Sequence, residues 1–277
     1  MGRVGAEPDR VTLGQMRLDA VEVARFERGE SENRTFWARI GGRPALRGCR
    51  VLEVGCGLGS LCVEVAQAGA TKVVGLDSDA KVVEFARRHV ARAFPHLAGI
   101  VEFHDLDPRD YTGHTFDCIV AKDSFEHILN LEGVLQEMKR LLVQGGRVYA
   151  GFGPLYNSPF GHHGRIPTRF PWRRFPWGHL LEGEAALVAR ANRVRAEGGH
   201  VFCYTEGPLT SIRDMGLNMY SLGDYRKALF GSGLKVVGFR VNQSTNPISS
   251  VLSLLRRVPF LEEYCTHNVY CVLEKAA

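Results

Sequence analysis

The residues best suited to chemistry in this 277-residue chain begin with the stretch "VLEVGCGLGS", residues 51–60. An apolar run ends there and three glycines follow at alternate positions: Gly55, Gly57 and Gly59. This spacing predicts a strand that turns tightly into a helix beneath a nucleotide. A dinucleotide-binding fingerprint has glycine where this chain has Ser60, and the carboxylate of Glu53 would repel a pyrophosphate. The pattern therefore favours a cationic ligand that carries no phosphate.

Two further acids lie where a nucleoside would need them. Asp77 ends the next apolar run, 22 residues after Gly55, where a carboxylate can accept hydrogen bonds from both ribose hydroxyls. Asp105 ends the stretch "HDLD", placed to accept from an adenine amino group, with Leu106 offering its backbone. S-adenosylmethionine (SAM) combines an adenosine with a sulfonium and an ammonium and has no phosphate, so it fits the pattern better than NAD, which Glu53 and Ser60 disfavour.

Three histidines are candidates for proton transfer, because a neutral imidazole near pH 7 can take a proton from an acceptor. His127 lies in "FDCIVAKDSFEHI", where a hydrogen bond that only fixes the loop is an equal alternative. His162 and His163 lie in the loop "GPLYNSPFGHHG". Adjacent histidines raise the question of a metal ion, but no acid or cysteine near them in the sequence completes a ligand set. We therefore expect no metal.

The stretch "RFPWRRFPWGH", residues 169–179, interleaves arginines with Trp172 and Trp177. These side chains could stack on RNA bases, or they could roof a hydrophobic pocket over a small acceptor. They could also be buried in a small core of their own or in a homodimer contact. The net charge of +5 falls short of that of a dedicated nucleic-acid binder. This favours side chains that cover a hydrophobic pocket, with a small molecule as the partner.

The elements that must position these residues follow an alternating pattern. Between residues 49 and 153, short β-branched runs alternate with helical stretches, which predicts βαβ units and a parallel sheet with its ligand edge at the strand C-termini. We expect an α/β, Rossmann-like fold of seven mostly parallel strands with helices on both faces. The predicted divisions are a helical cap (1–48), a cofactor-binding core (49–153), a lid insertion (154–215) and the rest of the core sheet (216–277).

The remaining composition fits a protein of the cytosol. The seven cysteines form no C-x-x-C pair, which indicates reduced core residues rather than disulfides or a zinc site. No apolar run reaches the length of a membrane span, and the first residues lack the apolar core of a secretory signal.

Five sequence blocks, in register, resemble the class I SAM-dependent methyltransferases. They are "VLEVGCGLG", "VVGLDSD", "HDLD", "FDCIVAKDSFEHI" and "LLVQGGRVYAGFGP", and together they cover residues 49–153. The resemblance implies SAM as cofactor and a seven-stranded sheet whose last strand is antiparallel. It implies SAM contacts at Glu53, Gly55, Gly57, Asp77, Ser78, Asp105, Leu106 and Lys122. It also implies that His127 lies near the methyl donor.

The acceptor is expected to be an oxygen or nitrogen of a small organic molecule, plausibly in natural-product biosynthesis. The chain has "AKDS" where enzymes that methylate nucleobase or amide nitrogens usually have an (Asn/Asp)-Pro-Pro-Tyr block. Two alternatives stay open at this point: an RNA methyltransferase, and a catalytically silent SAM-binding module.

Overall fold

The computed structural model of the protein describes residues 10–169, 175–243 and 247–276. Trp172 therefore lies outside the described residues. The chain divides into two compact units. Unit 1 takes in the described residues up to 35 together with residues 45–107, and unit 2 takes in residues 36–44 and everything from residue 108 onward. Each unit is described by itself below.

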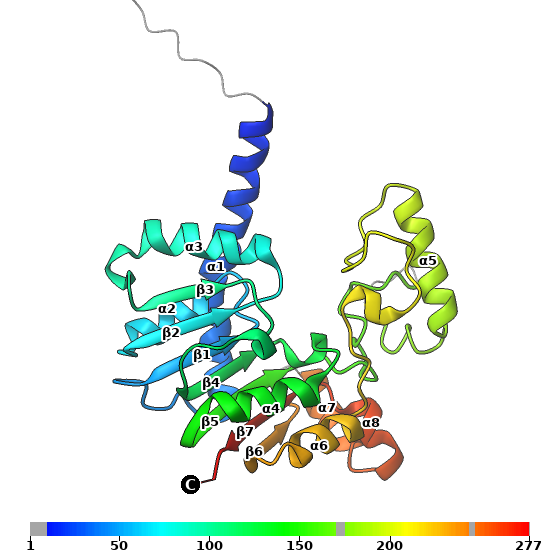
Figure 1. Ribbon diagram of the computed structural model, residues 1–277. Coiled ribbons are helices and arrows are strands. Elements are labelled where there is room, and N and C mark those ends of the chain that lie inside the picture. The colour runs from blue at the N-terminus through cyan, green and yellow to red at the C-terminus, as the bar shows by residue number, and fades with distance from the viewer. Residues whose placement is uncertain (1–9, 170–174, 244–246, 277) are drawn as a thin grey trace, which may run out of the picture. The chain divides into compact units, whose positions relative to one another are not determined.

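Eight α-helices and seven β-strands lie in the described chain (Figure 1). The helices are α1 (Arg10–Ile40), α2 (Ser60–Gln67), α3 (Ala80–Ala93), α4 (Leu131–Leu141), α5 (Glu184–Ala196), α6 (Leu222–Gly231), α7 (Pro247–Leu255) and α8 (Glu262–Cys265). The strands are β1 (Arg50–Val54), β2 (Lys72–Leu76), β3 (Val101–His104), β4 (Phe116–Lys122), β5 (Leu142–Phe152), β6 (Lys235–Val241) and β7 (Val269–Glu274). Short 3₁₀ turns lie at Pro95–Leu97, Pro108–Asp110, Phe125–His127, Ile212–Met215 and Pro259–Leu261.

The strands follow the order β3-β2-β1-β4-β5-β7-β6 in a seven-stranded sheet. Strand β1 pairs with β2, β2 with β3, and β4 with β5, all in parallel. Strand β7 runs antiparallel to both of its neighbours, β5 and β6. The predicted Rossmann-like, mostly parallel sheet with an antiparallel last strand is confirmed. Within the described residues, none of the helices has the length and apolarity needed to cross a membrane.

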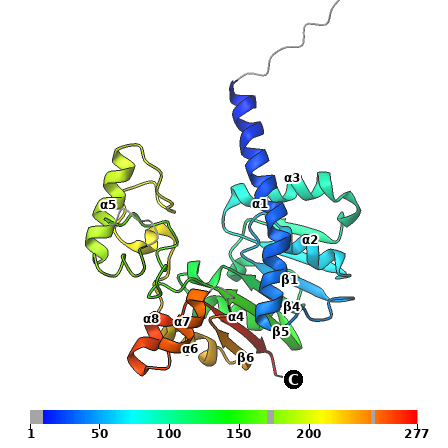
Figure 2. The ribbon, with the colours of Figure 1, turned by 180° about the vertical axis from the view of Figure 1, so that it is seen from behind.

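Unit 1 is built on three parallel strands, of which β1 and β2 are largely buried. Helix α3 begins where the sequence indicates, because the side chain of Asp79 accepts a hydrogen bond from the backbone N–H of Lys81 at 2.9 Å and caps its first turn. Helix α1 is continuous through the two adjoining stretches that look helical in the sequence, "LGQMRLDAVEVARFERGE" and "SENRTFWARI". It runs beside α2 (Figure 2), where Gly29 permits a close approach: a Cβ there would lie 2.1 Å from Oγ of Ser60.

Unit 2 corrects one predicted boundary. The stretch "LEGVLQEMKRLLVQGG" predicts a helix from residue 131 that the glycine pair at 145–146 stops, but helix α4 ends at Leu141 and strand β5 begins at Leu142. Leu142 pairs with Phe116 of β4, and the N–H of Gly145 donates to the carbonyl of Lys275 at 2.9 Å. Gly145 has a φ of +74°, which a helix cannot use. Pairing with distant strands therefore overrides the local helical pattern.

The segment between β5 and α6 has a hydrophobic cluster of its own. Helix α5 contributes Leu187, Val188 and Ala191 to it. The other buried members are Ile166, Val201, Leu209, Ile212, Met215 and Leu217. This cluster gives the insertion a packed interior, as expected of a folded element and not of a bare loop.

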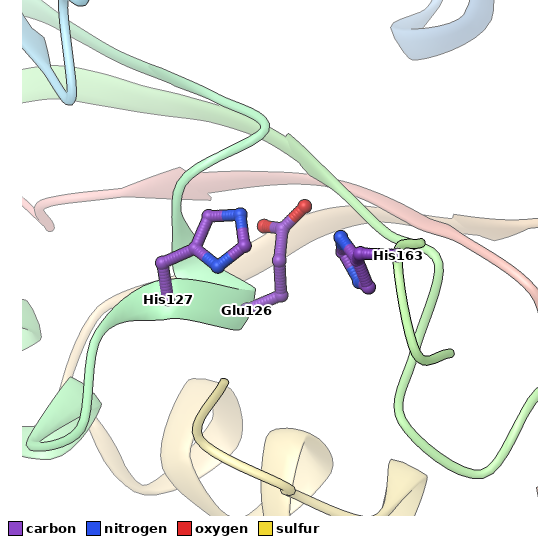
Figure 3. A group of neighbouring side chains, drawn as sticks. All are labelled: Glu126, His127 and His163. Carbon is purple, nitrogen blue, oxygen red and sulfur yellow. The ribbon is translucent and has the colours of Figure 1, made fainter. Parts of the chain in front are cut away.

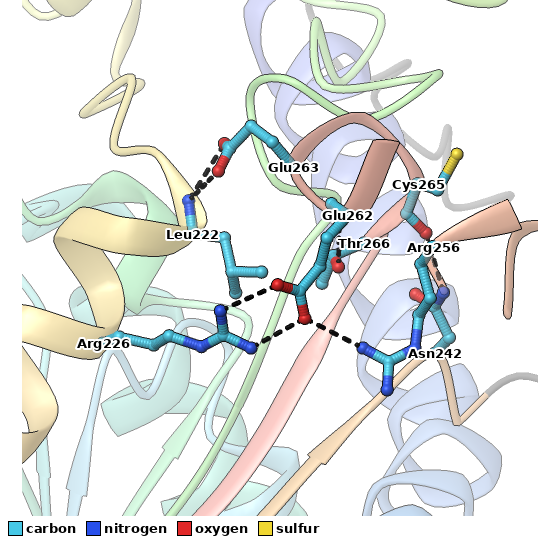
Figure 4. Close-up of polar contacts among 8 residues, drawn as sticks. All are labelled: Leu222, Arg226, Asn242, Arg256, Glu262, Glu263, Cys265 and Thr266. Carbon is cyan, nitrogen blue, oxygen red and sulfur yellow. Dashed lines mark hydrogen bonds and ion pairs between the residues drawn. The ribbon is translucent and has the colours of Figure 1, made fainter. Parts of the chain in front are cut away.

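Helix α8 is fastened to α6 by polar contacts (Figure 4), and a further contact joins it to the start of the insertion. The carboxylate of Glu262 accepts two bonds from the guanidinium of Arg226, at 2.8 and 3.0 Å. Glu263 accepts the first free N–H of α6, that of Leu222, and also the side-chain amide of Asn157 at 2.8 Å. The loop that leaves β5 is therefore anchored to the N-terminus of α6.

Candidate active site

The glycine-rich turn in unit 1 has the backbone shape that the sequence indicated. Gly55, Gly57 and Gly59 have φ values of +78°, +50° and +85°, in the region that favours glycine. Gly59 also has no room for a side chain, because a Cβ there would lie 2.6 Å from the ring of Phe103. The turn that joins β1 to α2 therefore depends on its glycines.

Asp77 at the end of β2 is fixed to this turn. One carboxylate oxygen accepts the N–H of Gly57 at 2.9 Å, and the other accepts the N–H of Asp79 at 3.0 Å. Burial raises the pKa of this carboxyl above its usual range, while the two backbone bonds oppose the rise. Each oxygen has a second lone pair, so Asp77 can hold the turn and still accept from a diol. Its neighbour Ser78 is exposed.

The other predicted cofactor contacts lie in different surroundings. Glu53 is buried at 3% exposure, and its carboxylate lies 3.0 Å from the Sγ of Cys62, which donates to it. Asp105 is exposed and pairs with the guanidinium of Arg87 at 2.8 Å, which lowers the pKa of its carboxyl. Leu106 is exposed as well. Lys122, the last residue of β4, belongs to unit 2. The SAM contacts of these residues stay predictions.

Unit 2 brings two of the three predicted histidines together with an acid. Glu126 and His127 lie on the 3₁₀ turn after β4, and His163 lies in the loop after β5. One ligand atom from each of these three residues lies within 4.8 Å of the other two. Figure 3 shows the carboxylate of Glu126 between the two imidazole rings. We call these three residues the Glu126 cluster.

A backbone carbonyl fixes the tautomer of His127. Its Nδ1 lies 2.6 Å from the carbonyl oxygen of Gly216, a contact that requires a proton on Nδ1. The guanidinium of Arg165 is 3.4 Å from the same nitrogen, but a protonated Nδ1 cannot accept from it, so the shorter contact decides. Burial, followed by the charge of Arg165, lowers the pKa of His127 to about 4. The ring is therefore neutral at pH 7, with the lone pair on Nε2.

His163 is also held by a backbone carbonyl, but through Nε2 instead of Nδ1. Its Nε2 donates to the carbonyl oxygen of Pro154 at 2.6 Å, which leaves the lone pair on Nδ1. Burial and the neighbouring His127 lower its pKa to about 3. The two rings pack edge to face, with centroids 5.3 Å apart. Two neutral imidazoles therefore face each other, each with one unprotonated nitrogen.

Glu126 is the buried acid of the cluster, with 3% of its surface exposed. One carboxylate oxygen accepts the N–H of Gly153 at 3.1 Å. The other, Oε2, is buried and has no hydrogen-bond partner among the described residues. Burial, and then the charge of Asp123, raises the pKa of this carboxyl to about 8.

The turn that carries Glu126 and His127 is held by Asn218, which is 2% exposed. The side-chain amide of Asn218 donates to the carbonyls of Phe125 and Ile128 at 2.7 and 3.1 Å. Its backbone N–H donates to the carbonyl of Glu126 at 3.0 Å. Residues 216–218, which leave the insertion, therefore set the geometry of the turn after β4.

The structure separates the remaining candidates from the cluster. The ring of His162 is buried and stacks on that of His179 at 5.3 Å, while the adjacent His163 turns toward His127. Trp177 is half-buried, and its indole N–H donates to the carbonyl of Tyr264 at 3.1 Å. The described contacts of Trp177 therefore tie the insertion to α8.

Sequence reasoning missed Glu126, Arg165 and Asn218. The argument against a metal ion relied on the absence of an acid near His162 and His163 in the sequence. The structure supplies that acid from a turn 37 residues earlier than His163. A usable signal was present, since Glu126 directly precedes a histidine that was already a candidate.

The region that contains the glycine turn matches a known protein family. Residues 46–151 match the family model described as a methyltransferase domain. These residues form a class I SAM-dependent methyltransferase domain. The family uses SAM as its methyl donor, as the cationic-ligand argument from Glu53 predicted.

Two curated relatives are similar to the chain over part of its length. One is the ubiquinone biosynthesis O-methyltransferase of Vibrio cholerae, 34% identical over 108 residues, which are 38% of this chain and 42% of that protein. The other is the 27-O-demethylrifamycin SV methyltransferase of Amycolatopsis mediterranei, 32% identical over 124 residues, which are 44% of this chain and 46% of that protein. The chain thus spans less than half the length of each of these relatives.

Among solved structures, the chain resembles geranyl diphosphate C-methyltransferase from Streptomyces coelicolor, solved with S-adenosyl-L-homocysteine. The TM-score is 0.54 with 14% identity, and the match covers 93% of this chain and 84% of that one. At this identity the likeness shows the fold alone.

Proposed function

We propose that the chain transfers a methyl group from SAM to an oxygen atom of a small organic molecule. The observation that carries the proposal is the methyltransferase domain at residues 46–151. The glycine turn braced by Asp77 supports it, because this carboxylate keeps acceptor capacity for a ribose diol.

Oxygen is favoured over nitrogen by the relatives. The Vibrio protein is named an O-methyltransferase of ubiquinone biosynthesis, and the Amycolatopsis protein a 27-O-demethylrifamycin SV methyltransferase. The chain also has "AKDS" in place of the block usual in enzymes that methylate nucleobase or amide nitrogens, which speaks against those acceptors. A role in natural-product biosynthesis belongs to this proposal.

Methyl transfer to oxygen needs a nucleophilic oxygen in line with the bond from sulfur to the methyl carbon. SAM supplies the reactive methyl and leaves as S-adenosylhomocysteine. A hydroxyl acceptor must lose a proton as the new bond forms. His127 and His163 each offer an unprotonated ring nitrogen while the other nitrogen is held by a backbone carbonyl. Both rings are thus oriented to act at the hydroxyl of an acceptor bound by unit 2.

The test is an incubation with SAM carrying an isotopic label in its methyl group. A panel should pair phenols and alcohols with amines of matched shape, with mass spectrometry locating the label. The proposal expects label on oxygen in at least one hydroxylated compound, and less label with Asp77→Ala when SAM is below saturation. If SAM binds but no member of a broad panel accepts the label, the chain is a silent SAM-binding module. If the label enters RNA, the proposed acceptor class is wrong.

A further inference from the structure

We propose that Glu126, His127 and His163 bind a divalent transition-metal ion of the kind that prefers imidazole, represented by Zn²⁺ and Co²⁺. Two imidazole nitrogens and one carboxylate oxygen are a ligand set that leaves coordination positions open for water or substrate. Metal binding itself goes beyond methyl transfer and does not depend on it.

The donor atoms are close enough for a modest rearrangement to close the site. Their mutual distances do not exceed 4.8 Å. In a tetrahedral zinc site with bonds of about 2.1 Å, donor atoms lie about 3.4 Å apart. Loading the site therefore requires the side chains to approach by at most roughly 1.4 Å, which small side-chain rotations can supply.

The hydrogen bonds around the cluster point to a metal more strongly than the distances do. Histidines that bind metals generally donate their second ring nitrogen to a carboxylate or backbone carbonyl, which fixes the tautomer and the ring. Both histidines do so here, to Gly216 and Pro154, each at 2.6 Å. The carboxylate follows the same rule, since one oxygen accepts from Gly153 while the other has no partner among the described residues.

Charge around the cluster also favours a cation. The charged groups that face Glu126 are Asp123, which adds negative charge, and Arg165, which adds positive charge. With both carboxylates ionised, the local charge is one negative unit. Arg165 opposes a cation: its guanidinium lies 3.4 Å from Nδ1 of His127, the ring nitrogen held by Gly216, and stacks on the ring of Phe202 with 4.1 Å between the guanidinium carbon and the ring centre. A metal ion would supply the positive charge that a buried carboxylate requires.

The role of the ion rests on the proposed function. A hydroxyl acceptor would coordinate the ion and lose its proton to solvent more readily, as metal-bound water does. The oxygen would then form a bond to the methyl carbon of SAM while the carbon–sulfur bond breaks and its electron pair stays on sulfur. With the ion bound, the free nitrogens of the two histidines are ligands, and this role replaces proton transfer by the rings themselves.

The experiment is calorimetric titration of the untagged, chelator-treated full chain with Zn²⁺, and optical titration with Co²⁺, without SAM or acceptor. We expect one site per chain. Glu126→Gln keeps the size of the side chain and removes the charged donor, and His163→Ala removes an imidazole. Each should weaken binding by at least roughly 100-fold, since loss of a mere supporting hydrogen bond already costs about 10–100-fold.

His179→Ala is the matched control. His179 is buried, and its Nε2 is likewise held by a backbone carbonyl, that of Tyr156 at 2.6 Å, but it lies outside the cluster. This variant should bind the ion as the wild type does. Circular dichroism and thermal melts establish that every variant is folded, and if Glu126→Gln fails to fold, His163→Ala decides.

Three outcomes would overturn the proposal. The wild type could bind neither ion. The folded Glu126→Gln and His163→Ala variants could bind as tightly as the wild type. Binding could disappear on alkylation of the thiols while the Co²⁺ spectrum shows thiolate charge-transfer bands, which would assign the site to cysteine. Because no methyl transfer is measured, failure here leaves the proposed methyltransferase activity standing, and the reverse also holds.

Discussion

Replacing Asn218 with leucine should loosen the turn that carries Glu126 and His127. The side chain of Asn218 is buried, and its amide N–H groups donate to two backbone carbonyls of the turn. Its oxygen also accepts the hydroxyl of Tyr225 at 2.9 Å and the N–H of Tyr220 at 3.1 Å. Leucine has a similar size but can make none of these four bonds.

The magnitude follows from how buried each bond is. The bonds from Asn218 to Phe125 and from Tyr225 to Asn218 are fully buried, and losing each leaves a polar group unsatisfied at about 1–3 kcal/mol. The two partly buried bonds add about 0.5–1.5 kcal/mol each. Burial of the leucine side chain returns about 1.5–3 kcal/mol. With central values, the lost bonds cost about 6 kcal/mol and the leucine returns about 2 kcal/mol, so the net loss of unfolding free energy should be about 4 kcal/mol.

The assay is urea denaturation of the wild type, Asn218→Leu, Tyr225→Phe and the double variant, monitored by circular dichroism. Tyr225→Phe alone should cost less, because it leaves the two bonds to the turn intact. The double variant should be less destabilised than the sum of the two, since both changes remove the same bond. Turnover of Asn218→Leu should fall even where the protein is fully folded, because the turn no longer positions Glu126 and His127.

Two results would refute this reasoning. A loss below about 1 kcal/mol for Asn218→Leu would show that the amide bonds contribute little beyond what leucine restores. Strict additivity of the two single changes would show that Tyr225 and Asn218 do not act through one hydrogen bond.

Three further predictions concern the insertion and its histidines. Burial lowers the pKa of His179 to about 4, so its neutral form stabilises the fold above pH 6.5. This contribution, roughly 3 kcal/mol, is lost as the pH falls from about 6.5 to 4. In urea melts, His179→Gln should lose less stability between pH 7.5 and 5 than the wild type, and equal losses would contradict the assignment. His163→Ala should cut turnover by about 10²–10⁴-fold at unchanged SAM affinity, whereas His162→Ala, whose ring faces away from the cluster, should cut it far less; equal effects in single-turnover assays would refute the distinction. Replacing residues 154–215 with a short linker should leave SAM binding intact and abolish transfer, and normal turnover by the folded variant would mean that the insertion does not bind the acceptor.

The glycine turn and the strand pattern could be predicted from sequence because their causes are local. Positive φ angles at Gly55, Gly57 and Gly59, and the cap at Asp79, depend on the residues themselves and their near neighbours. The alternation of strands and helices then determined the sheet type.

The cluster in unit 2 could not be predicted in the same way, because its parts meet only through folding. Glu126 reaches His163 across 37 positions of sequence, and the Asn218 that braces its turn comes 92 positions later. The start of β5 at Leu142 depends on pairing with Phe116. None of these contacts can be predicted from the local sequence pattern. The predicted helix was therefore longer than α4, and the buried acid Glu126 was not identified.

The most direct test of the central claim is calorimetric titration of the full chain with SAM, with S-adenosylhomocysteine and NADH as companion ligands. We expect one site for SAM and for S-adenosylhomocysteine and no binding of NADH. Asp77→Ala should weaken SAM binding by about 1–3 kcal/mol, the cost of unsatisfied hydrogen-bonding groups on the ribose and on the N–H of Gly57. Binding of NADH with no response to SAM, or SAM affinity unchanged in Asp77→Ala, would contradict the account.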